Sequence, residues 1–159
     1  DHRDLHSFPT RRSSDLGHTG FASGTLKSLK HLLGALPEQC ISVEYTDWLS
    51  TNMLSRMMCD ALHAADSGDG VVFITDILGA APFRSAALMS HKHSKCEVVV
   101  GISLGAMIQL FPQRGALTAS EFRDHALELT RGQATSLWHE QNRHPTVMVR
   151  SSEACNIEN

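Results

Sequence analysis

The sequence predicts a doubly wound α/β domain whose mostly parallel sheet carries helices on both faces. From Asp15 onward, short β-branched runs alternate with longer segments of helical period, and this alternation is typical of βαβ units in a sheet that is covered on both sides. The chain has 159 residues, of which 42% are hydrophobic, and this length suits one core and leaves little room for a second. We therefore expect a single domain.

Three strands and two of the helices follow directly from the pattern. Strands are expected at residues 39–45, 71–76 and 97–102. Apolar residues at three- and four-residue spacings predict a helix that ends at Gly34 and a second helix across residues 53–65, both packed on the sheet. We expect the methionines of the second helix to fill gaps in the core. The apolar positions are Leu26, Leu29, Leu32 and Leu33 in the first helix and Met53, Leu54, Met57, Met58, Ala61, Leu62 and Ala65 in the second.

Three further helices are indicated by the residues at their ends. Pro82 suits the first position of a helix, because its missing N–H and its fixed φ are tolerated there. A short helix is expected over residues 104–110. The last helix begins at a capping box formed by Thr118 and Glu121, and we expect it to close at Trp138.

The two ends of the chain do not fit this scheme. Residues 1–14 carry only two sizeable apolar residues, although a parallel βαβ fold calls for an apolar strand directly before Gly17. We interpret residues 1–14 as an unrelated or disordered leader that replaces the first strand, and their end resembles translated sequencing-adapter read-through. The alternative is a sheet that lacks this member. Residues 141–159 are interpreted as a loosely ordered tail, which leaves residues 15–140 as the domain.

Composition argues against several classes of partner. Lys and Arg number 14 and Asp and Glu number 17, which gives a formal net charge of −3, and this balance does not favour binding to nucleic acid or to an anionic membrane. Apolar runs such as residues 71–74 are far shorter than the roughly 20 residues that span a bilayer. The polar start of the chain is not a signal peptide. We therefore expect a cytoplasmic protein.

The spacing of the cysteines and histidines does not predict a metal site. The four cysteines form no C-x-x-C pair, and buried free thiols in a reducing cytosol are the expected state. The nearest approach to a histidine cluster is His91-Lys92-His93, for which a solvated loop between helix and strand is the favoured interpretation.

Two loop segments, residues 17–24 and 75–83, hold the side chains that suggest chemistry. Each lies where a strand should end and a helix begin, and ligands bind at this carboxyl edge of open parallel sheets. His18 from one loop and Asp76 from the other can therefore meet. A carboxylate that accepts a hydrogen bond from one ring nitrogen fixes the tautomer and leaves the other nitrogen free to act as a nucleophile.

Phosphate is the natural ligand of such a pair of loops. Glycines at positions 17, 20 and 24 let the backbone approach a tetrahedral group, and helices that start near Phe21 and Pro82 would aim free N–H groups at its oxygens. Because histidine is partly neutral at cytosolic pH, His18 needs no strong base to accept a phosphoryl group. The alternatives are a plain glycine turn and, for Asp76, a helix cap or a buried turn.

Four segments form an ordered set along the chain: GHTGFASG at 17–24, VFITDILGAAPFR at 72–84, EVVVG at 97–101 and RGxxTSL at 131–137. This set resembles the enzyme IIA component of the mannose-family phosphotransferase system, and the N-acetylgalactosamine/galactosamine branch is most similar. The resemblance runs from about Leu16 to about Glu140, which is roughly four-fifths of the chain. The ordered set is more specific than either loop alone.

The resemblance implies a homodimeric phosphocarrier. His18 would take a phosphoryl group from the histidine-containing phosphocarrier protein and pass it to a IIB component, and Asp76 would be the aspartate that orients the histidine. No cofactor is implied, and the transported sugar, an amino sugar of the N-acetylgalactosamine/galactosamine type, never touches this domain. The membrane is involved only through the transporter complex. Transfer between two histidines is nearly isoenergetic, so catalysis would rest on positioning and on charge stabilisation.

The resemblance also implies roles for neighbouring positions. The chain departs from the family at Thr19, where a glycine usually follows the active histidine, and in the turn at residues 79–83, where the family has Gly-Gly-Ser/Thr-Pro-Phe. A reshaped loop and a lost hydroxyl are the expected consequences. For Arg84, a plain exposed helix charge is the alternative to a partner-facing role. The phosphoryl-binding positions would be Gly20, Gly79, Ala80 and Ala81, and the partner-facing positions Phe83 and Arg84.

Other functions share this architecture. A receiver-like or flavodoxin-like regulatory module would use Asp76 as the phosphoacceptor, but it would need an acidic cluster near the first strand to hold Mg²⁺, for which Asp15 alone is a poor substitute. The glycine spacing is not that of dinucleotide sites, and no nucleophile elbow supports a hydrolase. The sequence therefore favours the phosphocarrier.

Overall fold

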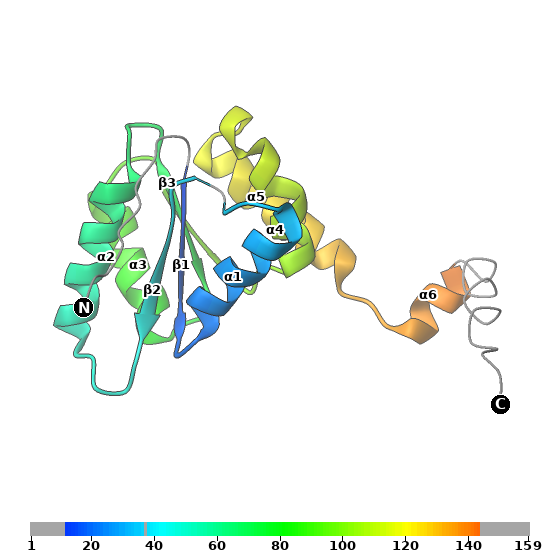
Figure 1. The fold of residues 1–159 in the computed structure, drawn as a ribbon, viewed down its shortest axis with the longest axis horizontal. Coiled ribbons are helices and arrows are strands. Elements are labelled where there is room, and N and C mark those ends of the chain that lie inside the picture. Colours follow the sequence, from blue (N-terminus) through cyan, green and yellow to red (C-terminus); the bar gives the residue numbers. More distant parts are fainter. Residues whose placement is uncertain (1–11, 37, 144–159) are drawn as a thin grey trace.

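The computed structural model describes residues 12–36 and 38–143, which form a four-stranded sheet between two layers of helices (Figure 1). The order of the strands across the sheet is β2-β1-β3-β4, and all three pairings are parallel. The predicted α/β fold with a parallel sheet is confirmed. The strands are β1 (Arg12–His18), β2 (Cys40–Tyr45), β3 (Val71–Thr75) and β4 (Cys96–Val100).

Helices cover both faces of this sheet. In Figure 1, α2 and α3 lie on one face and α1, α4 and α5 lie on the other, while α6 extends away from the body. The predicted helices are found within a few residues of their expected positions, except that the last one ends earlier than expected. The helices are α1 (Phe21–Leu33), α2 (Thr51–Ala65), α3 (Ala81–Lys92), α4 (Leu104–Leu110), the 3₁₀ helix η1 (Phe111–Ala116), α5 (Ala119–Gln133) and α6 (Leu137–Arg143).

The helix ends confirm the signals that the sequence carries. Gly34 ends α1 with a φ of 80°, a conformation that glycine adopts without strain. Pro82 lies in the first turn of α3. Thr118 and Glu121 form a complete capping box at α5, in which each side chain accepts a hydrogen bond from the other residue's backbone N–H.

Strand β3 separates two apolar cores because its side chains alternate between the faces of the sheet. Val72 and Ile74 pack with α1, α4 and α5, and Val71 and Phe73 pack with α2 and α3. All five residues of β3 are buried. The strand thus anchors the loop that follows it, which begins with Asp76.

The position of the first strand is filled, so our expectation that this strand is replaced by a leader or is missing from the sheet is wrong. The interpretation of residues 1–14 as unrelated to the domain stays a prediction. Residues 12–18 form β1, which lies between β2 and β3 and pairs with both. Strand pairing uses backbone N–H and C=O groups that every residue except proline supplies, so a polar sequence can still complete the ladder. Residues 1–11 lie outside the described residues.

The C-terminal part of the domain also differs from prediction. Helix α5 ends at Gln133, with Ala134 in an extended conformation, so it does not run to Trp138. Trp138 belongs instead to α6, where its side chain is 67% exposed. The tail that we expected from residue 141 therefore begins inside a helix, and residues 144–159 lie outside the described residues.

Several apolar positions are less buried than the helical pattern suggests. Met58 is buried, whereas Met53 and Met57 of the same helix, as well as Leu32 of α1, are exposed. These residues flank the buried stripe of each helix, and a helix that packs on one sheet buries only one face. Among the cysteines, Cys40 is buried, Cys59 and Cys96 are half-buried, and all three are free thiols. Cys155 lies outside the described residues.

Candidate functional site

His18 and Asp76 come together at the carboxyl edge of the sheet. His18 is the last residue of β1, and Asp76 follows the last residue of the neighbouring strand β3. Because the two strands are parallel neighbours, their carboxyl ends meet at one edge. The sequence prediction that these two residues meet is confirmed.

The two residues are joined by two hydrogen bonds to a single carboxylate oxygen. The backbone N–H of His18 donates to Asp76 Oδ2 over 2.7 Å, and His18 Nδ1 lies 2.9 Å from the same oxygen. An ionised carboxylate can only accept, so Nδ1 carries the proton in this contact. In the neutral ring, Nε2 therefore holds the lone pair.

The carboxylate of Asp76 is held in its charged form. Burial raises its pKa and is the largest single influence, but the bonds from the His18 backbone, from the His18 ring and from the Ile77 N–H together outweigh it, so the pKa lies below its usual value of 3.8. The Ile77 N–H reaches the other oxygen, Oδ1, over 2.8 Å. Asp76 is 9% exposed and His18 is 42% exposed. The histidine is thus the member of the pair that faces solvent.

The end of β2 holds the histidine loop from the other side, and sequence reasoning missed this. The Tyr45 ring meets the His18 ring edge to face, with 5.3 Å between their centres. The Glu44 carboxylate accepts hydrogen bonds from the backbone N–H groups of Gly20 and Ser23. No local sequence signal identifies these contacts, because they follow from the register in which His18 pairs with Tyr45 across the ladder.

The chain on either side of His18 needs glycine at positions 17 and 20, but not at 19. A Cβ on Gly17 would lie 2.3 Å from the Phe21 ring, and Gly20 has a φ of 82°. Among the described residues, the non-glycine residues with positive φ are Gln39 and Lys95, so Thr19 is unstrained. The expectation that Thr19 reshapes the loop has no basis in the backbone angles.

The β3–α3 turn supplies a second set of backbone groups at this edge. Gly79 has a φ of 77°, and no side chain caps α3 at Ala80. The Ala80 N–H donates to the Ile77 carbonyl over 3.2 Å. Within residues 12–36 and 38–143, the structure gives the N–H groups of Ala81 and Phe83 no partner. These two groups are thus open at the start of the helix.

Arg84 is tied to the same turn. Its guanidinium donates to the Gly79 carbonyl over 2.7 Å, and the residue is exposed. This bond restrains the turn on the side that leads into α3. The Arg84 side chain is therefore an exposed charge that is held to this turn by one hydrogen bond.

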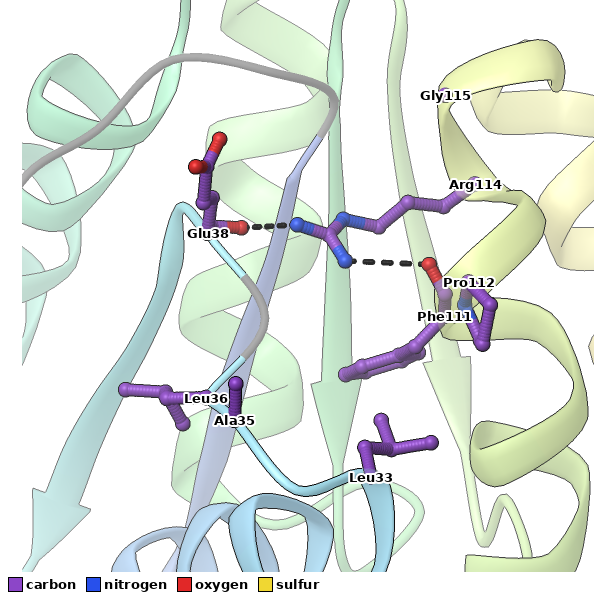
Figure 2. Close-up of a pocket in the computed structure, with 8 residues that line it drawn as sticks. All are labelled: Leu33, Ala35, Leu36, Glu38, Phe111, Pro112, Arg114 and Gly115. Carbon is purple, nitrogen blue, oxygen red and sulfur yellow. Dashed lines mark hydrogen bonds between the residues drawn. The ribbon is translucent and has the colours of Figure 1, made fainter.

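Two cavities near α1 differ in their relation to this site. One, of about 400 Å³, lies beside the histidine loop and is lined by residues of α1 and of the segment at 102–107. The other, of about 480 Å³, is at the opposite edge, next to the amino end of β2. Figure 2 shows Arg114 reaching across the second cavity to the carbonyl oxygens of Phe111 and Glu38. That arginine joins two loops and is remote from His18.

The described part of the chain offers neither a metal site nor a membrane-spanning helix. No group of three or more His, Cys, Asp and Glu side chains there could hold a metal ion. No helix among those residues is long and apolar enough to cross a membrane. His91 and Lys92 lie in the last turn of α3 and His93 caps it, rather than forming the expected loop.

Comparison with protein families and curated proteins gives two matches over most of the chain. The EIIA-man family model, described as the fructose IIA component of the phosphotransferase system, matches residues 16–127. The chain is 49% identical over 133 residues to YadI of Escherichia coli (strain K12), whose name describes it as a phosphotransferase enzyme IIA component. The match covers 84% of this chain and 90% of YadI.

Solved structures of low sequence identity share the fold. The phosphotransferase system component EIIA from Streptococcus agalactiae superposes with a TM-score of 0.74 at 16% identity, covering 82% of this chain and 99% of that one. The mannose/sorbose-specific IIA subunit from Enterococcus faecalis gives 0.71 at 18% identity, covering 81% and 96%. At these identities the similarity shows the fold alone.

Proposed function

Because this chain belongs to the mannose-type enzyme IIA family of the phosphotransferase system, and is thus a phosphotransferase component, we propose that His18 is its phosphoryl acceptor and that Asp76 orients it. The observation that carries this proposal is the 2.9 Å contact between His18 Nδ1 and Asp76 Oδ2, which leaves Nε2 as the nucleophilic nitrogen of an exposed ring. A IIA component implies two partners, the histidine-containing phosphocarrier protein as donor and a IIB component as acceptor.

The transfer can be written with its electrons balanced. The Nε2 lone pair of His18 attacks the phosphorus of the donor's phosphohistidine, the new N–P bond forms, and the old N–P bond breaks with its electron pair returning to the donor imidazole. The proton on Nδ1 stays hydrogen-bonded to Asp76, which stabilises the positive charge that develops on the ring. When the IIB component takes the group, its acceptor atom attacks the phosphorus, and the His18 N–P bond breaks with its electron pair returning to Nε2.

The phosphoryl oxygens need donors at this edge. We assign them to the β3–α3 turn, at Gly79, Ala80 and Ala81, because the Ala81 and Phe83 N–H groups are open there and the helix start attracts negative charge. Ala80 contributes by its place in the turn, since its own N–H donates to Ile77. Gly20 contributes by its turn rather than by its N–H, which Glu44 already holds. Phe83 and Arg84 are proposed to face the protein partners.

The test is phosphorylation by phosphoenolpyruvate, enzyme I and the histidine-containing phosphocarrier protein. Wild type is expected to take up an acid-labile label, His18→Ala none, and His31→Ala the wild-type amount, because His31 is an exposed histidine on α1. A label that is removed by base and by hydroxylamine, and that is lost in Asp76→Ala, would indicate the receiver alternative instead. The geometry disfavours that outcome, since both oxygens of Asp76 already accept hydrogen bonds.

The transported sugar and the assembly are further parts of the proposal. The resemblance of the four ordered segments to the N-acetylgalactosamine/galactosamine branch supports an amino sugar. The resemblance to the family as a whole supports a homodimer, and the composition supports a cytoplasmic location. The sugar is tested by transfer from phosphorylated wild type to IIB components of different sugar specificities. The fastest transfer is expected to an amino-sugar IIB. Sedimentation equilibrium tests the dimer, and a monomer at micromolar concentration would contradict it.

A further inference from the structure

We propose that Glu44 is a positioning residue for phosphoryl transfer, acting by capping α1 from the neighbouring strand and so fixing the turn that carries His18. This inference rests on the proposed function for its kinetic consequence. Its structural basis is the carboxylate of Glu44, whose two oxygens each accept one backbone hydrogen bond, from Gly20 over 2.8 Å and from Ser23 over 2.6 Å.

Helix α1 needs a cap from elsewhere in the chain. Its N-cap residue is Gly20, which has no side chain and makes no side-chain cap bond. A serine, threonine or aspartate at that position would normally accept the N–H three residues later, which here belongs to Ser23. Glu44 accepts that N–H instead, and places a negative charge where the helix dipole favours one.

The cap ties the His18 turn to β2 on one side while Asp76 ties it to β3 on the other. The His18 N–H donates to Asp76, and two residues later the Gly20 N–H donates to Glu44. The chain between these bonds is His18-Thr19-Gly20, whose glycine lies in the left-handed region and so could adopt other angles readily. Two opposed anchors therefore fix the direction of the His18 ring.

The same contacts decide which helix can receive phosphoryl oxygens. With the Gly20 and Ser23 N–H groups bound to Glu44, the start of α1 offers an incoming anion less than the sequence suggests. The carboxylate is also half-buried and negatively charged. Glu44 thus directs the phosphoryl oxygens away from α1 and toward the open N–H groups of α3.

The experiment compares Glu44→Ala and Glu44→Gln with a cap variant elsewhere. Thr118→Ala removes the cap of α5 without touching the His18 turn, so it controls for lost helix stability. Phosphorylation of His18 is followed at increasing concentrations of phosphorylated carrier. Glu44→Ala is expected to transfer about 10- to 100-fold more slowly at saturation with an unchanged KM, and Glu44→Gln to fall between it and wild type because one acceptor oxygen remains.

NMR spectra of the Gly20 and Ser23 amides and of the His18 ring nitrogens provide a readout that does not depend on activity. Glu44→Ala is expected to shift all three sets of signals, and high acetate to restore them partly, whereas Thr118→Ala leaves them unchanged. Unchanged His18 ring signals in folded Glu44→Ala, or transfer at the wild-type rate, would overturn the inference. Absence of label on wild type would instead overturn the proposed function, and the NMR comparison would still decide the role of Glu44.

Discussion

At the scale of single residues, the site pairs a solvent-exposed histidine with a largely buried carboxylate. Asp76 accepts three hydrogen bonds, two from His18 and one from Ile77, and so acts as the fixed part of the pair. The His18 side chain is 42% exposed, and under the proposed function its Nε2 is the atom that a protein partner would reach. Substitution of Asp76 is therefore expected to alter the protonation and direction of the His18 ring, whereas substitution of His18 removes the phosphoryl acceptor of the proposed function.

Replacing Asp76 with asparagine should slow transfer by at least about ten-fold. The amide can turn its NH₂ group toward Nδ1, which favours the tautomer with the proton on Nε2 and removes the nucleophilic lone pair. Rapid-quench measurement of label uptake checks the rate, and ¹⁵N signals of the ring report the tautomer. A wild-type rate with the proton still on Nδ1 would contradict this role for Asp76.

The lowered pKa of Asp76 predicts a pH dependence of stability. The folded carboxyl has its pKa below 3.8, its value when unfolded, so at pH values near and below 3.8 the unfolded chain binds more protons than the folded one. The stabilisation by this carboxylate is therefore complete above pH 3.8 and is lost as the pH falls through the folded pKa. In urea unfolding from about pH 5 to about pH 2, Asp76→Asn should show a shallower loss of stability than wild type. If the free energies of unfolding of wild type and Asp76→Asn fell in parallel with pH, Asp76 would not be the source of this pH dependence.

At the scale of elements, two glycines with positive φ shape the short link between α2 and β3. The link from α2 to β3 contains Gly68 and Gly70, with φ values of 102° and 100°. A Cβ at Gly70 would lie 2.3 Å from the Lys95 carbonyl oxygen, at the start of β4, whereas a Cβ at Gly68 would meet nothing within 4 Å. An alanine at position 68 would therefore meet only the strain of a positive φ, whereas an alanine at position 70 would also collide with the Lys95 backbone.

These glycines give a matched pair of stability predictions. Gly68→Ala should lower the free energy of unfolding by about 1–3 kcal/mol through its positive φ. Gly70→Ala should cost about 1–3 kcal/mol more, because the backbone oxygen of Lys95 cannot move away without disturbing the pairing of β3 and β4. Urea unfolding measures both, and equal losses would show that the approach to Lys95 does not constrain the sheet.

At the scale of the whole molecule, an unusual feature is the polar sequence of the central strand. Strands covered on both faces are usually apolar along their length, but β1 has the sequence RSSDLGH. Its backbone completes the ladder between β2 and β3. Without that pairing, two apolar strands would each expose a row of hydrogen-bonding groups.

A more apolar β1 should therefore stabilise the fold. Ser13→Val combined with Ser14→Val is expected to raise the free energy of unfolding by about 1–3 kcal/mol, measured by urea unfolding. Ser42→Val is the control, because that serine is an exposed residue of β2, an edge strand, and it should change stability little. A loss of stability in the double variant would show that this strand position does not favour apolar residues.

Much of the fold could be predicted because its signals are local. The run of Val71–Thr75, the glycine after α1 and the capping box at Thr118 each act within a few residues, and each is found where expected. The end of α5 could not be predicted, since Trp138 continues the apolar pattern into what is a separate helix. A pattern of that kind does not show where the backbone becomes extended.

The sequence by itself determined the α/β fold, the family and the meeting of His18 with Asp76, because strand order in a parallel sheet brings successive loops to one edge. Only the tertiary structure decided which groups surround that pair. Across the pairing of β1 with β2, Tyr45 contacts the His18 ring and Glu44 binds the backbone of the turn that follows it. The filled position of β1 depends on backbone bonds that carry little sequence signal. Contacts between strands are set by register, and register is a property of the folded sheet.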